Sequence, residues 1–280
     1  MISAKVIEDS LSPVGVRLTT LELRYPRFIH AEFMTHRKFS RNASSSRAIP
    51  VSKMLEQVRR DIAMPTYWGK NQPGMQAFEE VDDQTKEEAK RIWVDAASAA
   101  LMYAKQMHEL GVHKQTVNRI LEPFMYISVI VTASSFQNFF DLRLHKDAQP
   151  EIKDLAFAMQ EALNASDPIR RINDNSKVAN WHLPYVSQAE REAENDPYQL
   201  AKISAARCAR VSYLTHDGRT PDISEDLKLY DRLVGSKPIH ASPVEHQAYP
   251  QATGSRNFDG WYQFREIVEK QLRSGESKWR

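Results

Sequence analysis

The sequence predicts an α+β fold, in which a small, mostly antiparallel sheet packs with several long helices. Few segments show the alternation or the β-branched clustering of strands, whereas helical periodicity extends over longer segments and no internal repeat is present. The 280 residues, 41% of them apolar and 26% charged, can bury a substantial core. We expect a single domain over residues 1–280, with residues 165–197 as a connection or surface insertion.

The N-terminal part is expected to begin its sheet early. A strand is predicted over residues 16–26, where apolar residues alternate with polar or small ones up to a proline. Residues 28–33 are expected to form a short helix or turn. Ser52 can cap a helix that ends before Pro65, because its hydroxyl can accept from a free amide at the start of the helix. Residues 67–76, with two glycines and a proline, are predicted to be a loop.

The longest helix is predicted over residues 82–110, where apolar residues recur at spacings of four and three. Gly111 is expected to stop this helix, since glycine readily adopts the left-handed conformation found just after helix ends. A further helical turn over residues 114–121 should end before a proline. The β-branched run 125–132 is typical of a buried strand.

Helices dominate the rest of the chain. Ser134 or Ser135 is expected to cap a helix over residues 136–140. An amphipathic helix should follow Pro150, because its apolar residues fall on one face. Three more helices are predicted, at residues 200–207, 223–233 and 261–272.

The composition limits the classes of function. A formal net charge of +2 is too small by itself to indicate nucleic-acid binding. No segment approaches the roughly 20 apolar residues of a membrane span, and the N-terminus lacks the apolar run of a signal peptide. The single cysteine, Cys208, excludes an internal disulfide and is expected to be a small buried side chain. We expect a cytoplasmic protein with neither nucleic-acid nor membrane partners.

Residues 36–47 are rich in groups that bind anions. They read HRKFSRNASSSR, with three arginines, a lysine, four serines and an asparagine. Guanidinium forks and hydroxyls suit a phosphate, and an asparagine amide can both donate and accept toward the edge of a heterocycle. On charge alone a solvated basic loop is the better interpretation. The spacing of the residues favours a binding site instead.

That spacing resembles the signature of flavin-dependent thymidylate synthases. The family pattern is Arg-His-Arg, two residues, Ser, one residue, Asn, two residues, Ser, one residue, Arg. Six residues match it in order: His36, Arg37, Ser40, Asn42, Ser45 and Arg47. Thr35 replaces the leading arginine.

Two downstream segments are similar to further segments of this family. Arg119, in Val-Asn-Arg-Ile-Leu, matches a substrate-binding arginine. Asn138 and Arg143 match the family's Asn-Phe-x-x-Leu-Arg stretch, which continues in this chain with Ala-Gln and then Glu-Ile. Alone, each arginine would be interpreted as a surface ion-pair residue. Their occurrence together with the signature favours a common site.

Two more segments resemble family segments but stand in another order. Residues 208–213, Cys-Ala-Arg-Val-Ser-Tyr, and residues 240–246, His-Ala-Ser-Pro-Val-Glu-His, resemble the beginning of family members yet lie near the C-terminus. The resemblance therefore implies the family's fold with a circularly permuted order, which is feasible because termini usually lie at the surface. His240 and His246 lack the spacing of metal ligands on a helix face, so no metal site is predicted.

The resemblance also implies a site of two parts. The pyrimidine deoxynucleotide would be bound by Glu32, Ser45, Ser46, Arg47, Arg119 and Arg143. Of these, Arg143 and Ser45 would be the catalytic residues. FAD would be held by His36, Arg37, Lys38, Asn42, Asn138, Leu142, Ser212, His240 and Ser242. Methylenetetrahydrofolate would supply the carbon, NADPH would reduce the flavin, and a homotetramer is expected.

The expected reaction is conversion of dUMP to dTMP. C5 of uracil is a weak nucleophile, so an enzyme either adds a thiolate at C6 or polarises the ring beside a strong electrophile. The only thiol, Cys208, lies in a segment that resembles a flavin-contacting region, which disfavours the thiolate route. The resemblance implies the second route, in which Arg143 stabilises negative charge on the ring and flavin delivers hydride.

Four positions depart from the family pattern, namely Thr35, Ala43, Asp147 and Glu32. Glu32 replaces a glutamine, and a carboxylate there can accept from the exocyclic amine of cytosine, which uracil lacks. Loss of contacts at Ala43 and Asp147 would admit water to a methylene intermediate. Hydroxymethylation of dUMP or dCMP is therefore one alternative function. A catalytically inactive protein that binds nucleotide or flavin is another.

Overall fold

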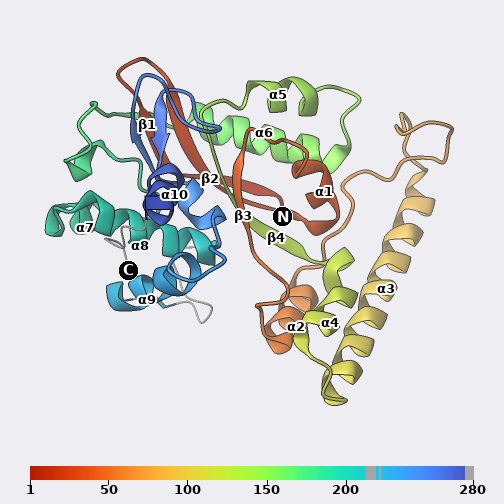
Figure 1. Cartoon of the computed structure of the whole chain (residues 1–280). Helices are drawn as coiled ribbons and strands as arrows, with labels where there is room; N and C mark the ends of the chain where they lie inside the picture. Colours follow the sequence, from red (N-terminus) through yellow and green to blue (C-terminus); the bar gives the residue numbers. More distant parts are fainter. Residues whose placement is uncertain (212–218, 221, 275–280) are drawn as a thin grey trace.

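A five-stranded sheet forms the centre of the computed structural model, which describes residues 1–211, 219–220 and 222–274 (Figure 1). The strand order is β3-β4-β2-β1-β5. All neighbouring pairs are antiparallel except β1 with β5. The strands are β1 (Ser3–Leu11), β2 (Arg17–Pro26), β3 (Ser40–Ala43), β4 (Tyr126–Ala133) and β5 (Ile169–Arg170). The α+β class with a small, mostly antiparallel sheet is confirmed.

Helices surround this sheet. The α-helices are α1 (His30–Phe33), α2 (Val51–Arg60), α3 (Asp83–Glu109), α4 (Lys114–Val117), α5 (Gln137–Arg143), α6 (Pro150–Asn164), α7 (Gln188–Ala193), α8 (Pro197–Arg210), α9 (Ile223–Val234) and α10 (Phe264–Ser274). The 3-10 helices are η1 (Arg27–Ile29), η2 (Asn118–Phe124), η3 (Val178–Asn180) and η4 (Ser242–Glu245). A second, two-stranded sheet pairs β6 (Ala248–Pro250) with β7 (Trp261–Gln263). None of the helices in the described part of the chain has both the length and the apolar character needed to cross a membrane.

The long elements follow the sequence closely, and the differences lie at helix ends. Helix α2 begins at Val51 after Pro50, so Ser52 lies within the first turn and does not cap it. Helix α5 has Phe136 at its N-cap position with no side-chain cap, so neither predicted serine has that role. The turn after α4 continues as η2 through Pro123, because this segment tightens into a 3-10 helix that tolerates the proline.

The helix predicted from residue 261 begins three residues later. Trp261–Gln263 instead forms β7, which pairs with residues 248–250. The segment 165–197 contains β5, η3 and α7, and its Trp181 side chain is fully buried. This segment leads into a second hydrophobic core, which Trp181 shares with helices α8, α9 and α10.

The two faces of the main sheet differ in chemistry because side chains alternate along each strand. One face carries Leu21, Leu23 and Val129, and its apolar core extends onto α6 through Ile152 and Leu155, whose helix lies along β1 and β2. The other face is largely polar and meets the C-terminal half of the chain. In Figure 1, α5 and α6 lie on one side of the sheet and α7 to α10 on the other.

A continuous chain of buried hydrogen bonds crosses the polar face. Thr20 Oγ1 bonds to Thr132 Oγ1 at 2.7 Å and to His182 Nε2 at 2.8 Å. His182 Nδ1 reaches Ser10 Oγ at 3.0 Å, and Thr132 Oγ1 reaches His246 Nδ1 at 2.8 Å. Because buried polar groups cost free energy unless they are paired, this chain fixes the C-terminal half against strands β1, β2 and β4.

Candidate functional site

Strand β3 carries the middle of the segment His36–Arg47 at the edge of the main sheet. It pairs only with β4 in that sheet, from Ser40 opposite Thr132 to Ala43 opposite Val129. The segment therefore has two ends separated by the length of this strand. The first end meets α5 and the second meets η2.

The first end of the segment is a buried histidine bonded to an arginine. His36 is 8% exposed, and its Nε2 accepts from Nε of Arg143 at 3.0 Å. The imidazole packs against the rings of Phe39 and Phe139. Burial, followed by the nearby charges of Arg143 and Arg41, lowers the pKa of His36 to about 4. His36 is thus neutral at physiological pH, with its proton assigned to Nδ1 because Nε2 acts as acceptor.

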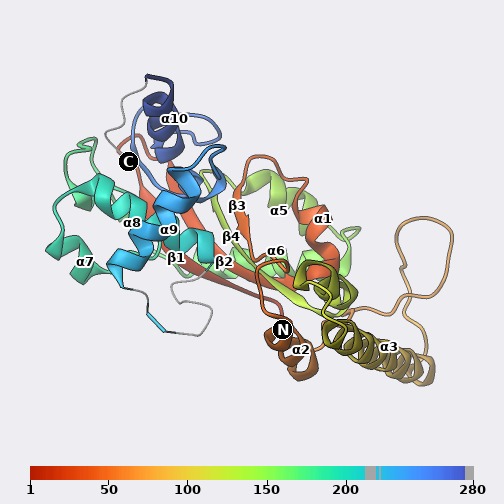
Figure 2. The same ribbon diagram turned by 60° about the horizontal axis from the view of Figure 1, so that its bottom comes forward.

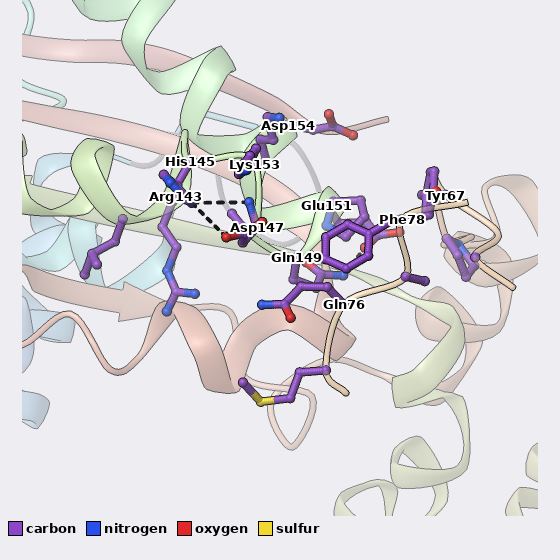
Figure 3. Close-up of a pocket in the computed structure, with 18 of the residues that line it drawn as sticks. Tyr67, Gln76, Phe78, Arg143, His145, Asp147, Gln149, Glu151, Lys153 and Asp154 are labelled. Carbon is purple, nitrogen blue, oxygen red and sulfur yellow. Dashed lines mark hydrogen bonds and ion pairs between the residues drawn. The ribbon is translucent and has the colours of Figure 1, made fainter. Parts of the chain in front are cut away.

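A cavity of about 1380 Å³ opens beside Arg143 (Figure 3). One wall is the stretch 141–154, from the end of α5 to the start of α6, and the other is the loop that carries Tyr67 and Phe78. Phe78 is 72% exposed, so this wall offers an aromatic face to anything in the cavity. The size and the mixture of aromatic and charged groups suit a large planar ligand.

Glu151 ties the two walls of this cavity together. Its carboxylate, which is almost fully buried, accepts from the backbone amide of Thr66 at 2.6 Å and also from the side-chain amide of Gln149. Thr66 begins the loop wall, while Gln149 and Glu151 belong to the opposite wall. This role is not among those predicted from the sequence, although Glu151 lies in the Glu-Ile pair that resembles the family stretch.

The second end of the segment converges on Glu122. Its Oε1 accepts from Ser46 Oγ at 2.7 Å and pairs with Arg119 NH1 at 2.9 Å and with Arg27 NH2 at 3.1 Å. Although burial opposes ionisation, the Ser46 hydrogen bond and the charges of Arg27 and Arg119 lower the pKa of Glu122. The Glu122 carboxylate therefore already accepts from Ser46 and Arg119, two of the residues that were predicted to bind the phosphate.

Neighbouring groups hold this second end in shape. Asn118 Nδ2 donates to the carbonyls of Ser46 at 2.7 Å and Ile49 at 3.0 Å. The side chains of Ser45 and Arg47 are exposed beside this anchored turn. Arg27 and Glu122 are not among the site residues predicted from the sequence. The spacing of three between Arg119 and Glu122 is the signal that could have indicated their ion pair.

The residues predicted for FAD divide into two groups. Arg37, Asn138 and Leu142 are exposed around the first end of the segment. His240 and Ser242 are exposed as well, and Ser242 begins η4, which packs against β3. These five side chains are accessible to a ligand.

The other residues predicted for FAD have internal partners or are not described. Asn42 is buried and donates to the backbone carbonyl of Cys208 at 3.1 Å. Lys38 pairs with Asp259 at 2.8 Å. Ser212 lies outside the described residues. Asn42 thus links the signature to α8, which brings residues far apart in the sequence together.

Cys208 is fully buried, as expected, with Sγ 3.6 Å from Nε2 of Gln247. Burial raises the pKa of its thiol well above the ordinary value, so it is not a thiolate nucleophile at neutral pH. Within residues 1–211, 219–220 and 222–274, no group of three or more His, Cys, Asp or Glu side chains is arranged to hold a metal ion.

The positions that depart from the family pattern have local structural roles. Thr35 Oγ1 donates to the carbonyl of Glu32 at 2.7 Å. Asp147 lies 3.5 Å from Nδ1 of His145, across the cavity from Phe78 (Figure 3). Glu32 is different, because its Oε2 is buried and has no hydrogen-bond partner in the described part of the chain.

Comparison with known proteins identifies the family of the chain. A family model described as thymidylate synthase complementing protein matches residues 6–169, more than half of the chain. The match includes the segment His36–Arg47 together with Arg119, Asn138 and Arg143, and it ends before residues 208–246. No curated protein matches the chain.

Two solved structures of the UMP/dUMP methylase PolB from Streptomyces cacaoi are similar to this chain. The one bound with 5-Br UMP has a TM-score of 0.51 and 18% identity, and the match covers 58% of this chain and 88% of that one. The one bound with 5-Br dUMP has a TM-score of 0.50 and 17% identity, and the match covers 58% and 90%. At these identities the likeness shows a shared fold.

Proposed function

The chain belongs to the family of thymidylate synthase complementing proteins, and on this premise we propose that it transfers a one-carbon unit to C5 of a pyrimidine deoxynucleotide. The expected reaction is dUMP to dTMP, with methylenetetrahydrofolate as carbon donor. The observation that carries the proposal is the Arg143 guanidinium, held by neutral His36 at the edge of a large cavity. The circular permutation is part of the proposal, and the bond from Asn42 to Cys208 and the packing of η4 against β3 support it.

Arg143 would stabilise negative charge that develops on the pyrimidine ring. Its Nε is used by His36, and its terminal nitrogens have no hydrogen-bond partner in the described part of the chain. Because His36 is neutral, it orients the guanidinium without adding a second positive charge. A donor fixed before the reaction stabilises a developing anion without reorganisation at the moment of reaction.

The second end of the segment would bind the phosphate. Ser45 and Arg47 are exposed there, beside Ser46 and Arg119. Arg27, Arg47 and Arg119 carry three positive charges against the single negative charge of Glu122, so the site keeps a net charge of +2. A phosphate can therefore bind although Glu122 already accepts from Ser46.

The exposed side chains fit a flavin better than the buried ones do. Arg37, Asn138, Leu142, His240 and Ser242 are free to contact FAD, whereas Asn42 and Lys38 would first have to leave their partners. Bound FAD, once reduced by NADPH, would supply the hydride. The site residues are expected to come from several subunits of a homotetramer in the cytoplasm, with neither nucleic-acid nor membrane partners.

Hydroxymethylation, with dCMP as well as dUMP as acceptor, is a second candidate function, and Glu32 favours it. Its buried Oε2 has no partner in the described residues, and an unsatisfied buried acceptor costs about 1–3 kcal/mol. The exocyclic amine of cytosine could donate to this oxygen, whereas uracil presents a carbonyl at that position. Water capture of the bound methylene would end the reaction without hydride transfer.

Mass spectrometry of the products separates these functions. The purified protein is incubated with reduced FAD, methylenetetrahydrofolate and either dUMP or dCMP. A methylated product supports the first function, and a hydroxymethylated product supports the second. A protein that binds nucleotide or FAD and leaves both nucleotides unchanged is the inactive binding protein. A colourless protein that takes up no FAD and converts neither nucleotide contradicts the enzyme proposal.

A further inference from the structure

One flank of helix α3 carries an apolar stripe that faces solvent. Helix α3 lies along the outer edge of the molecule (Figures 1 and 2). Its buried side, with Ala97, Ala100 and Ala104, packs against α2 and η2. A solvent-facing flank is normally polar, yet Ile92 is 63% exposed and Tyr103 is 54% exposed.

The stripe has the spacing of one face of a straight α-helix. We call it the α3 seam, and its members are the exposed Ile92, Ala96, Tyr103, Gln106 and Leu110 and the half-buried Ala99. They follow one another at steps of four and three, an average of 3.6 residues, which is the α-helical repeat and keeps these side chains in one line along the helix. Leu110, the residue that caps the helix at its C-terminus, is 81% exposed. From Ile92 to Leu110 the helix advances by 18 residues, so the seam is about 27 Å long.

We propose that the α3 seam is the contact between two copies of this chain, paired antiparallel about a twofold axis. In this alignment Ile92 lies opposite Leu110 of the second copy, and Ala99 lies opposite its Tyr103. A large side chain then meets a small one at the centre, and two apolar side chains meet at each end. Interhelical packing favours such complementary volumes.

Charge also favours the antiparallel arrangement. Arg91 and Glu109 are both exposed at opposite ends of the seam. Antiparallel pairing brings Arg91 of one copy within a turn of Glu109 of the other, and it sets the two helix dipoles in opposite directions. A parallel pair would instead place Arg91 beside Arg91 and Tyr103 beside Tyr103. Self-complementarity of this kind identifies a second copy as the occupant of the seam.

A mass measurement tests the seam directly. Wild-type protein and the variants Ala99→Glu, Tyr103→Glu and Val94→Glu are compared by sedimentation velocity over a range of protein concentrations. Val94 is the matched control, since it is also an exposed apolar residue of α3 but, two residues after Ile92, lies on the opposite side of the helix from the seam. We expect the two seam variants to fall to half the mass of the wild-type assembly, while Val94→Glu keeps that mass. Circular dichroism verifies that all three variants fold.

A wild-type protein that is monomeric at every concentration contradicts the proposal. Seam variants that keep the wild-type mass contradict it as well. Neither outcome depends on catalysis, nucleotide or flavin, so failure here is distinguishable from failure of the proposed function.

Cysteine cross-linking tests the direction of the pair. Ile92→Cys and Leu110→Cys are introduced together and singly, and Cys208 does not interfere because it is fully buried. Within one chain the two positions are about 27 Å apart, too far for a disulfide, which needs Cα atoms within about 7 Å. Antiparallel pairing predicts cross-linked dimers from the double variant alone. Efficient cross-linking of either single variant would mean a parallel pair and would overturn the proposed alignment.

Discussion

The two ends of the segment His36–Arg47 differ in the partners of their arginines. At the first end, a neutral histidine in an aromatic environment holds Arg143, and the remaining donors of that arginine border an open cavity. At the second end, Glu122 already neutralises part of the charge of Arg27 and Arg119 and accepts from Ser46. The first end is prepared for a ligand, whereas at the second a ligand has to join or displace an internal carboxylate.

This difference indicates which end would act in catalysis and which in nucleotide binding. An arginine oriented by a neutral partner keeps its full charge for a developing anion. Arginines that share a carboxylate keep their geometry at some cost in attraction for phosphate. We therefore expect changes at the first end to affect rate and changes at the second to affect affinity.

The largest effect is expected for Arg143→Ala. Loss of a fixed donor to a developing anion costs about 2.7–4 kcal/mol, or a fall in kcat of about 100- to 1000-fold. Steady-state kinetics with saturating nucleotide would measure it. Lys146→Ala is the control, because Lys146 is another cation that lines the same cavity. An equal loss in both variants would mean that general positive charge, not the position of Arg143, matters.

The next effect is expected for Arg47→Ala, at the second end. Loss of a charge-assisted hydrogen bond should weaken binding of dUMP by about 1.5–3 kcal/mol, which isothermal titration calorimetry can measure. Deoxyuridine, which lacks the phosphate, serves as the control ligand and should bind equally to wild type and variant. Unchanged dUMP affinity would remove Arg47 from the phosphate site.

A smaller effect, of opposite sign, is expected for Glu122→Gln. Removing a negative charge beside the phosphate should strengthen dUMP binding by about 1 kcal/mol, the scale of a Coulomb interaction at 4 Å in water. Glu192→Gln, which changes an exposed carboxylate on α7, controls for the change in net charge. Weaker binding in Glu122→Gln would show that Glu122 supports the phosphate donors rather than competing with the ligand.

The smallest effect is expected from titration of His36. Because its pKa is about 4, kcat/KM should show no inflection from this histidine near 6.5, its ordinary value. A pH profile of wild type beside His36→Gln would test this. An inflection near 6.5 that disappears in the variant would mean that His36 titrates as an ordinary histidine.

The same depressed pKa should appear in stability. The unfolded chain takes up a proton at His36 as pH falls below about 6.5, whereas the folded chain takes it up only when pH falls to about 4. The free energy of unfolding contributed by this group is therefore fully present above 6.5 and is lost as pH falls toward about 4. Urea denaturation at several pH values should show a shallower decline in His36→Gln than in wild type.

Local patterns in the sequence determined much of the fold. The strand ending at Pro26, the long helix before Gly111 and the amphipathic helix after Pro150 are found as expected, because alternation and helical periodicity reflect which face is buried. The family was also evident from the spacing of residues 36–47 and from Arg119 and Arg143. Such signals depend on neighbours along the chain, which the sequence contains in full.

Tertiary structure decided which of those residues are available for binding. Asn42 and Lys38 have the right types for a flavin site, yet they are paired with Cys208 and Asp259, more than 160 and 220 positions away. Glu122 came to hold Ser46 because η2 packs beside the turn that follows β3. The sequence by itself determined the chemical groups and the family; only the folded chain decided their partners, because hydrogen bonds between distant segments leave no periodic trace in the sequence.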